Sequence, residues 1–133
     1  MNKFEKLLNK LEELNLPDKG YAIYGSGPMA IRKIRAAHDL DIVVKNDLFK
    51  ELNRKYSEIE KGFIKLEKGM IEIFSAQNSL IDNPKKVIDR AELINGLRFI
   101  KLDDLMTWKK KMGRQKDFDD IKLIKHYLKK QNK

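Results

Sequence analysis

Residues 21–44 read YAIYGSGPMAIRKIRAAHDLDIVV, and this stretch decides the fold. Its first four residues are apolar or aromatic, which predicts a short β-strand. The Gly-Ser-Gly sequence at 25–27 then breaks the strand, and Pro28 suits the first turn of a helix that we expect to run to about Arg35. The predicted order is therefore a strand, a glycine turn and the N-terminus of a helix.

The same stretch ends in a second predicted strand, residues 39–44, which begins with Asp39-Leu40-Asp41. Residues two apart in a strand project from the same face, so the two carboxylates lie side by side and repel one another. A divalent cation relieves this repulsion, and Mg²⁺ or Mn²⁺ suits an oxygen-rich site that is shared with substrate phosphates. The alternative is that Asp-x-Asp is only the start of a strand or a turn.

Outside this stretch, the apolar pattern predicts helices at both ends of the chain and further strands between them. Residues 3–14 carry Leu and Phe at helical spacing, which indicates an amphipathic helix. A turn is expected at 17–20, followed later by a helix that Asn46 caps. Two strands at 63–66 and 70–74 flank a turn at 67–69, a short helix follows Asn83-Pro84, and a hairpin lies within 93–100 around Asn95-Gly96. The chain then forms helices at 103–112 and about 116–130, which are divided at Gly113.

Together these elements predict an α/β (α+β) fold, in which helices flank a mixed sheet and a helical pair ends the chain. The 133 residues suffice for one compact domain and are too few for two cores with a linker. We therefore expect a single domain over 1–133, with a sheet-containing core at about 1–100 and C-terminal helices at about 103–130.

The composition excludes several kinds of site. The absence of cysteine rules out disulfides, iron–sulfur clusters and thiolate zinc sites, and His38 and His126 are too few for a histidine-based metal site. Any metal is therefore held mainly by carboxylates.

No stretch approaches the roughly 18 apolar residues that span a membrane, and the N-terminus lacks the apolar block of a signal peptide. We expect a cytoplasmic protein without a membrane partner.

The chain carries 29 Lys and Arg against 20 Asp and Glu, a net charge of +9. This surplus favours polyanionic partners such as nucleic acids or nucleoside triphosphates. The alternative is that much of the excess is a solvated, lysine-rich C-terminal helix end.

The Gly25-Ser26-Gly27 turn is a candidate phosphate site, because a turn from a strand into a helix offers free backbone N–H groups and a positive dipole end. It can equally be an ordinary tight turn.

Glu72 interrupts the apolar run MIEIF, where a sheltered carboxylate needs a cation or a donor. Glu72 is thus a third metal ligand or the base that takes the acceptor's proton, unless it is an edge-strand residue facing water.

Lys109, Arg114 and Asp117 lie near the junction of the last two helices, in TWKKKMGRQKDFDDI. The basic side chains can neutralise a triphosphate. In the alternative interpretation, Lys109 belongs to a solvated helix face, and Asp117 is a carboxylate favoured by the dipole at a helix N-terminus.

These residues resemble a known pattern. The run YGSGPMAIRKIRAAHDLDIVV resembles the Gly-Ser turn, helix and Asp-x-Asp strand of the DNA polymerase β-like nucleotidyltransferase superfamily, and Glu72 falls where the third carboxylate strand is expected. The tail LDDLMTWKKKMGRQKDFDDIKLI is similar to the closing helices of small bacterial and archaeal predicted nucleotidyltransferases, including the AbiEii type of abortive-infection toxins. The matching segments span about residues 21 to 124.

The resemblance implies a minimal fold that binds a nucleoside triphosphate with Mg²⁺, two ions in the family's mechanism. It implies that Gly25 and Ser26 contact the phosphates, and that Asp39 and Asp41 hold the metals with Glu72 completing the site. Arg35 would then lie close to the triphosphate, and Lys109 would match the lysine of the toxin-like members' penultimate helix. Asp117 would match their final acidic position.

Two features depart from the family pattern. The third carboxylate of the superfamily is commonly Asp, and many members carry a bulkier residue than Gly27 after the serine of the turn. The chain also shows no second domain to bind an acceptor. A partner chain would supply that surface, or the acceptor is small or lies in an open cleft.

The expected activity is transfer of a nucleoside monophosphate from a triphosphate to a hydroxyl of an unidentified acceptor, which can be tRNA or another nucleic acid, a protein or a small molecule. One rival is a binding module with the same fold and weak or no catalysis. Another is a toxin or antitoxin component, in which the same transfer modifies a tRNA or a partner protein.

Overall fold

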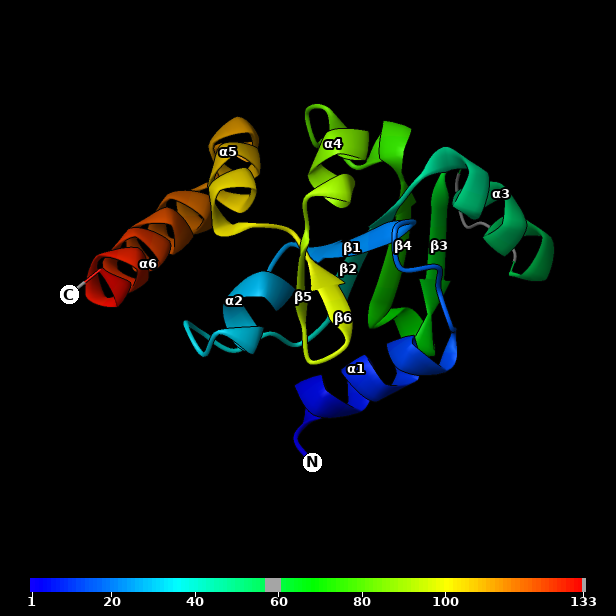
Figure 1. The fold of residues 1–133 in the computed structure, drawn as a ribbon, viewed down its shortest axis with the longest axis horizontal. Helices are drawn as coiled ribbons and strands as arrows, with labels where there is room; N and C mark the ends of the chain where they lie inside the picture. The colour runs from blue at the N-terminus through cyan, green and yellow to red at the C-terminus, as the bar shows by residue number, and fades with distance from the viewer. Residues whose placement is uncertain (57–60, 133) are drawn as a thin grey trace.

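The computed structural model describes residues 1–56 and 61–132, which form a mixed α/β structure on one six-stranded open sheet (Figure 1). The order of strands across the sheet is β3-β4-β2-β1-β6-β5. The strands are β1 (Tyr21–Tyr24), β2 (Leu40–Val44), β3 (Phe63–Leu66), β4 (Ile71–Ser75), β5 (Glu92–Ile94) and β6 (Leu97–Phe99). The helices are α1 (Lys3–Glu13), α2 (Gly27–Ile31), α3 (Asn46–Lys55), α4 (Pro84–Asp89), α5 (Leu102–Met112) and α6 (Gln115–Gln131), with short 3₁₀ turns η1 (Glu67–Gly69) and η2 (Ala76–Asn78).

The centre of the sheet is built from the stretch that decides the fold. β1 pairs antiparallel with β2, and β2 pairs parallel with β4 over its whole length. Two hairpins, β3–β4 and β5–β6, extend the sheet on either side. The two outermost strands are therefore β3 and β5, and β2 and β4 both lie in the interior of the sheet.

Helices cover both faces of the sheet, and alternating residues of the central strands divide between two apolar clusters. In β2, Ile42 and Val44 pack in the cluster that contains Leu7 and Leu11 of α1. Val43 packs in the other cluster, which is completed by residues of α2, α4, α5 and α6. The C-terminal helices thus pack against the second face of the sheet.

The alternation of side chains along β2 and β4 determines the face of the sheet from which the acidic residues project. Asp41 lies two residues before Val43, and Glu72 lies two residues before Phe74, which also packs against the second cluster. Side chains at i and i+2 of a strand share a face. Both carboxylates therefore project from the face that α5 and α6 cover.

The predicted mixed sheet, its flanking helices and the C-terminal helical pair are confirmed. The expected hairpins around 67–69 and Asn95-Gly96 are present, and Gly113 ends α5 in the left-handed conformation with φ +65°. Among the described helices, none is long and apolar enough to cross a membrane.

Two local predictions are wrong. The helix after Pro28 ends at Ile31 instead of about Arg35, because Lys33 adopts a left-handed φ of +60° that a helix does not accommodate. Asn46 does not cap α3, since the helix already includes it and Lys45 occupies the N-cap position. The early end of α2 places Arg35 in a loop.

Candidate metal and phosphate site

Three carboxylates from two neighbouring strands converge at one end of the sheet. Asp41 of β2 stands directly beside Glu72 of the parallel strand β4, and Asp39 precedes β2 by one residue. One carboxylate oxygen from each residue lies within 4.8 Å of the other two, and all three residues are partly buried. The three predicted carboxylates therefore lie together, and their role as metal ligands stays a prediction. The alternative of an exposed edge strand for Glu72 is wrong, because β4 is internal.

The environment of the cluster disfavours three negative charges. Burial, together with the smaller effects of the neighbouring Asp39 and Glu72, raises the pKa of Asp41 to about 7. Burial also raises the pKa of Glu72, with a contribution from Asp39 that Lys65 opposes. A bound cation would offset the repulsion between these carboxylates, which contributes to the raised pKa values.

The Gly25 turn is shaped by its contact with Asp41. Gly25 has a φ of +67°, and a Cβ atom at this position would lie 2.5 Å from the Asp41 Oδ2 atom. Gly27 is equally confined, because its Cβ atom would lie 2.5 Å from Cγ2 of Ile23. The two glycines therefore let the backbone of the turn lie against the acidic cluster and against β1.

Ser26 is the N-cap residue of α2, and its side chain makes no capping hydrogen bond. Gly25 and Ser26 both line the pocket that contains the three carboxylates. α2 is only five residues long, so its dipole is weaker than that of the longer helix we expected. The role of this turn in binding phosphate stays a prediction.

The pocket above the carboxylates has a volume of about 340 Å³ and is closed by residues of α5, α6 and the segment after β4. Its polar lining contains cations as well as the acidic cluster. It brings together all seven predicted site residues, Asp39, Asp41, Glu72, Gly25, Ser26, Arg35 and Lys109.

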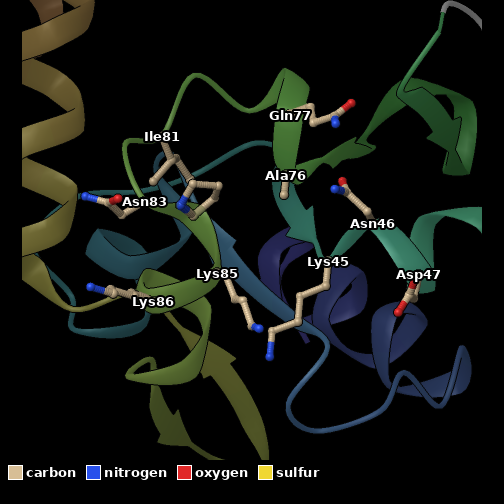
Figure 2. Close-up of a pocket in the computed structure, with 10 residues that line it drawn as sticks. Lys45, Asn46, Asp47, Ala76, Gln77, Ile81, Asn83, Lys85 and Lys86 are labelled. Carbon is tan, nitrogen blue, oxygen red and sulfur yellow. The ribbon is translucent and has the colours of Figure 1, made fainter.

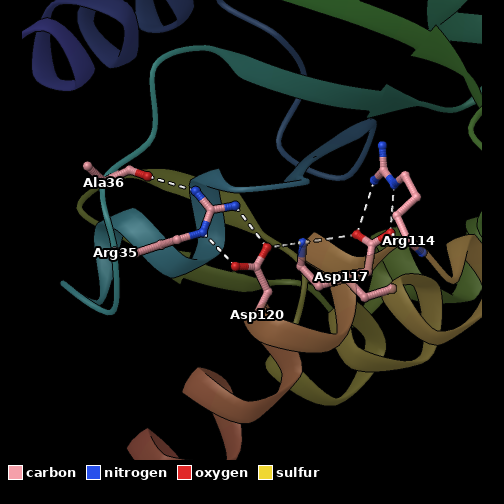
Figure 3. A network of polar contacts seen from close by, with 6 residues as sticks. Arg35, Ala36, Arg114, Asp117 and Asp120 are labelled. Carbon is pink, nitrogen blue, oxygen red and sulfur yellow. Dashed lines mark hydrogen bonds and ion pairs between the residues drawn. The ribbon is translucent and has the colours of Figure 1, made fainter.

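Lys109 is held in a buried ion-pair network that links α5 to α6 (Figure 3). Its side chain is 3% exposed, and its Nζ atom donates a hydrogen bond of 2.9 Å to Oδ2 of Asp120. Oδ1 of Asp117 lies 3.8 Å from the same Nζ atom. The alternative that Lys109 belongs to a solvated helix face is therefore wrong.

Arg35 and Arg114 extend this network at its two ends (Figure 3). Arg35 donates two hydrogen bonds to Asp120, 2.7 Å from Nε to Oδ1 and 2.9 Å from Nη2 to Oδ2. Arg114 likewise donates to Asp117, with a shortest distance of 2.7 Å, and the two residues form a capping box at the start of α6. The expectation that Asp117 is a helix N-terminal carboxylate is confirmed.

The network places fixed positive charge beside the acidic cluster. Lys109 and Lys116 both lower the pKa of Asp41, against the larger effects of burial and of the neighbouring carboxylates. Hydrogen bonding by Arg35 and Lys109 helps to hold the pKa of Asp120 low despite its burial. The buried carboxylate of Asp120 fixes the orientation of Arg35 and Lys109.

The sequence interpretation missed several pocket residues, of which Asp120 matters most. Asp117 and Asp120 are three residues apart and lie on one face of α6, a spacing that DFDDI contains but that surface helices also show. Tyr24 and Trp108 line the pocket too, with ring centroids 5.2 Å apart. No sequence pattern singled out Trp108, because its position in the pocket depends on how α5 packs.

No family model matches the chain, and the search of curated proteins finds no significant match. The fold and the site therefore define the molecule only by class. It is a mixed α/β protein in which an acidic cluster on the sheet faces a pocket with cations from a C-terminal helical pair.

Proposed function

We propose that the protein is a metal-dependent nucleotidyltransferase of the DNA polymerase β-like type. It transfers a nucleoside monophosphate from a triphosphate to a hydroxyl group and releases pyrophosphate. The observation that carries this proposal is the convergence of Asp39, Asp41 and Glu72 within 4.8 Å in a pocket that also contains Arg35 and Lys109. Carboxylates and cations in one pocket suit a substrate that arrives as a metal–triphosphate complex.

The donor set fits Mg²⁺ or Mn²⁺. All three residues offer hard oxygen donors, Asp41 and Glu72 from neighbouring strands and Asp39 from the residue before β2, and the described residues that line the pocket include no cysteine or histidine. The raised pKa of Asp41 and the clash that a side chain at Gly25 would create show that the cluster is tightly confined. A pair of divalent ions bound here would polarise the transferred phosphoryl group and neutralise developing charge.

The chain's own residues then have distinct tasks. Asp39 and Asp41, at the start of β2, would hold the metal that accompanies the triphosphate, and the backbone at Gly25 and Ser26 would contact its phosphates. Lys109 and Arg35 supply positive charge from positions fixed by Asp120, so little reorganisation is needed during the reaction.

The transfer step is a single in-line displacement at the α-phosphorus. The acceptor's hydroxyl oxygen forms a bond to this phosphorus, and the bond to the bridging oxygen of the leaving pyrophosphate breaks with its electron pair. We assign the acceptor's proton to Glu72, because its raised pKa makes it a stronger base than an ordinary glutamate and it is less deeply buried than Asp41.

Calorimetric titration tests the proposal directly. Each of ATP, CTP, GTP and UTP is titrated into the wild-type protein and into an Asp41→Asn variant, with and without Mg²⁺. We expect metal-dependent affinity for at least one triphosphate in the wild type and its loss in the variant. Incubation with labelled triphosphates and a cell extract then identifies the acceptor by the label it gains. Undiminished nucleotide transfer by Asp41→Asn would overturn the proposal.

One observation favours a second function, a nucleotide-binding or regulatory module with little catalysis. Arg35, Lys109 and Arg114 already make ion pairs with Asp117 and Asp120, so a triphosphate would have to share these cations. Such a module would bind a metal-bound triphosphate in the titration and label no acceptor. The transfer assay therefore separates the two functions.

A further inference from the structure

A large cavity lies away from the acidic cluster, between the start of α3 and α4 (Figure 2). Its volume is about 730 Å³. Lys45, Lys85 and Lys86 line it, and the amino groups of Lys45 and Lys85 extend toward the same space (Figure 2). Asn46 and Gln77 add neutral hydrogen-bonding groups to the wall.

A second hollow of about 320 Å³ adjoins this cavity and adds Lys50 and Lys61. It shares Asn46 and Gln77 with the first cavity, and it shares Asn78 with the pocket that contains Asp39, Asp41 and Glu72. η2, which ends at Asn78, follows the strand that carries Glu72. Residues of η2 therefore border all three hollows: Gln77 lines the two basic ones, and Asn78 lines the second of them and the acidic pocket. We call Lys45, Asn46, Lys50, Lys61, Lys85 and Lys86 the basic track.

Charge is distributed unevenly along the track. The linings of the two hollows together contain five lysines and one carboxylate, Asp47, whereas the whole chain has 29 basic and 20 acidic residues. Within the described part of the chain, Lys45 is the one track lysine with an ion-pair partner, Asp89. Hydrogen bonding by Lys45 lowers the pKa of Asp89, and the nearby charges of Lys85 and Lys19 lower it further. Positive charge therefore exceeds negative charge here by several units.

We propose that the basic track binds the phosphodiester backbone of a nucleic acid chain, which makes a nucleic acid the acceptor of the transfer reaction. The identity of the acceptor rests on the proposed function, whereas the binding of nucleic acid by the track does not. The phosphates of a nucleic acid backbone match a cluster of lysines, each of which acts as a flexible point charge. An acceptor held on the track would present a terminal hydroxyl near Glu72.

The chemistry of the track favours backbone contacts over reading of the bases. Its charged members are all lysines, which contact phosphates without the planar fork by which arginine reads guanine. The aromatic residue that lines the second hollow, Phe49, is only 7% exposed, so it offers little surface for stacking. Binding should accordingly depend strongly on salt and weakly on base sequence.

Fluorescence anisotropy of a labelled single-stranded RNA of roughly 20 nucleotides tests the track. The test variant is Lys50→Gln/Lys85→Gln/Lys86→Gln. The matched control is Lys3→Gln/Lys6→Gln/Lys10→Gln, which removes the same charge from exposed positions of α1. We expect the test variant to bind at least about tenfold more weakly and the control less than about threefold. The slope of log K against log salt should become shallower by about 2 in the test variant, since each lost phosphate contact removes about 0.7.

The proposal that the basic track binds nucleic acid would be wrong if the wild type bound no RNA at low salt, or if both variants lost equal affinity. It would also be wrong if polyglutamate displaced the RNA at equal charge concentration, because this would indicate an acidic protein as the partner. Calorimetry separates this proposal from the proposed function. Asp41→Asn should bind the RNA normally and lose Mg²⁺-dependent affinity for triphosphate, whereas the track variant should retain that affinity. RNA binding without metal-dependent triphosphate binding would contradict the proposed nucleotidyltransferase activity and would support the proposed nucleic acid binding by the basic track.

Discussion

At the scale of single residues, the site depends on the close approach of Gly25 and Asp41. The turn brings its backbone so near to the carboxylate that a Cβ atom would lie 2.5 Å from Oδ2. The positive φ of Gly25 is therefore only part of the reason for a glycine here. Its missing side chain also leaves room for the carboxylate and for a phosphate that would share its metal.

We expect Gly25→Ala to lower the free energy of unfolding by about 2–3 kcal/mol, because left-handed strain of about 1 kcal/mol is joined by the clash with Asp41. Mg²⁺ binding should weaken about tenfold as the carboxylate moves. Gly113→Ala is the matched control, since its φ is +65° but the nearest atoms to its Cβ lie 3.7 Å away. Urea unfolding and calorimetry measure both effects. Equal results for the two variants would show that the contact with Asp41 is unimportant.

At the scale of elements, α6 is attached to the rest of the molecule through buried charges as well as apolar contacts. Asp120 accepts hydrogen bonds from Lys109 of α5 and from Arg35 in the loop after α2. The early end of α2 makes this possible, because it frees Arg35 from helical geometry. Two helices and a loop are thereby joined through one carboxylate beside the pocket.

Asp120→Ala should lower the free energy of unfolding by about 2–4 kcal/mol, because the buried Lys109 would keep Asp117, 3.8 Å away, as its one carboxylate partner among the described residues. Asp119→Ala is the control. Asp119 is exposed and bonds only to Gln115 among the described residues, so its loss should change stability by less than about 0.5 kcal/mol. Urea unfolding compares the variants. A loss at Asp120 no larger than at Asp119 would contradict the proposed role of the buried pair.

At the scale of the whole molecule, the acidic cluster opposes folding unless a cation is bound. The pKa of Asp41 rises to about 7 in the folded protein from an ordinary 3.8, so the folded state binds more protons than the unfolded one between these values. The free energy of unfolding of the metal-free protein therefore falls as pH rises through this window. A cation bound at the proposed metal site would offset this loss of stability.

Mg²⁺ should consequently stabilise the protein more at pH 8, where Asp41 is mostly ionised, than at pH 6, where about a tenth of it is ionised. The affinity for Mg²⁺ should be about tenfold higher at pH 8 than at pH 6, as measured by the Mg²⁺ dependence of the urea midpoint. Metal-free Asp41→Asn should be more stable than the wild type at pH 8, by on the order of 2 kcal/mol, and should gain little from Mg²⁺. Addition of EDTA should reverse the gain in the wild type. Equal stabilisation at both pH values would contradict this linkage.

The amino-acid sequence by itself determined the order of the elements and the acidic cluster. Period-two alternation predicted that Asp39 and Asp41 lie side by side, and the family resemblance implied Glu72 as the third carboxylate beside them. Only the tertiary structure decided which cations join them. Arg35 and Asp120 are 85 residues apart, and their contact depends on where α2 ends and how α6 packs. The basic track likewise combines lysines from α3, α4 and the segment before β3, which only the folded chain brings together.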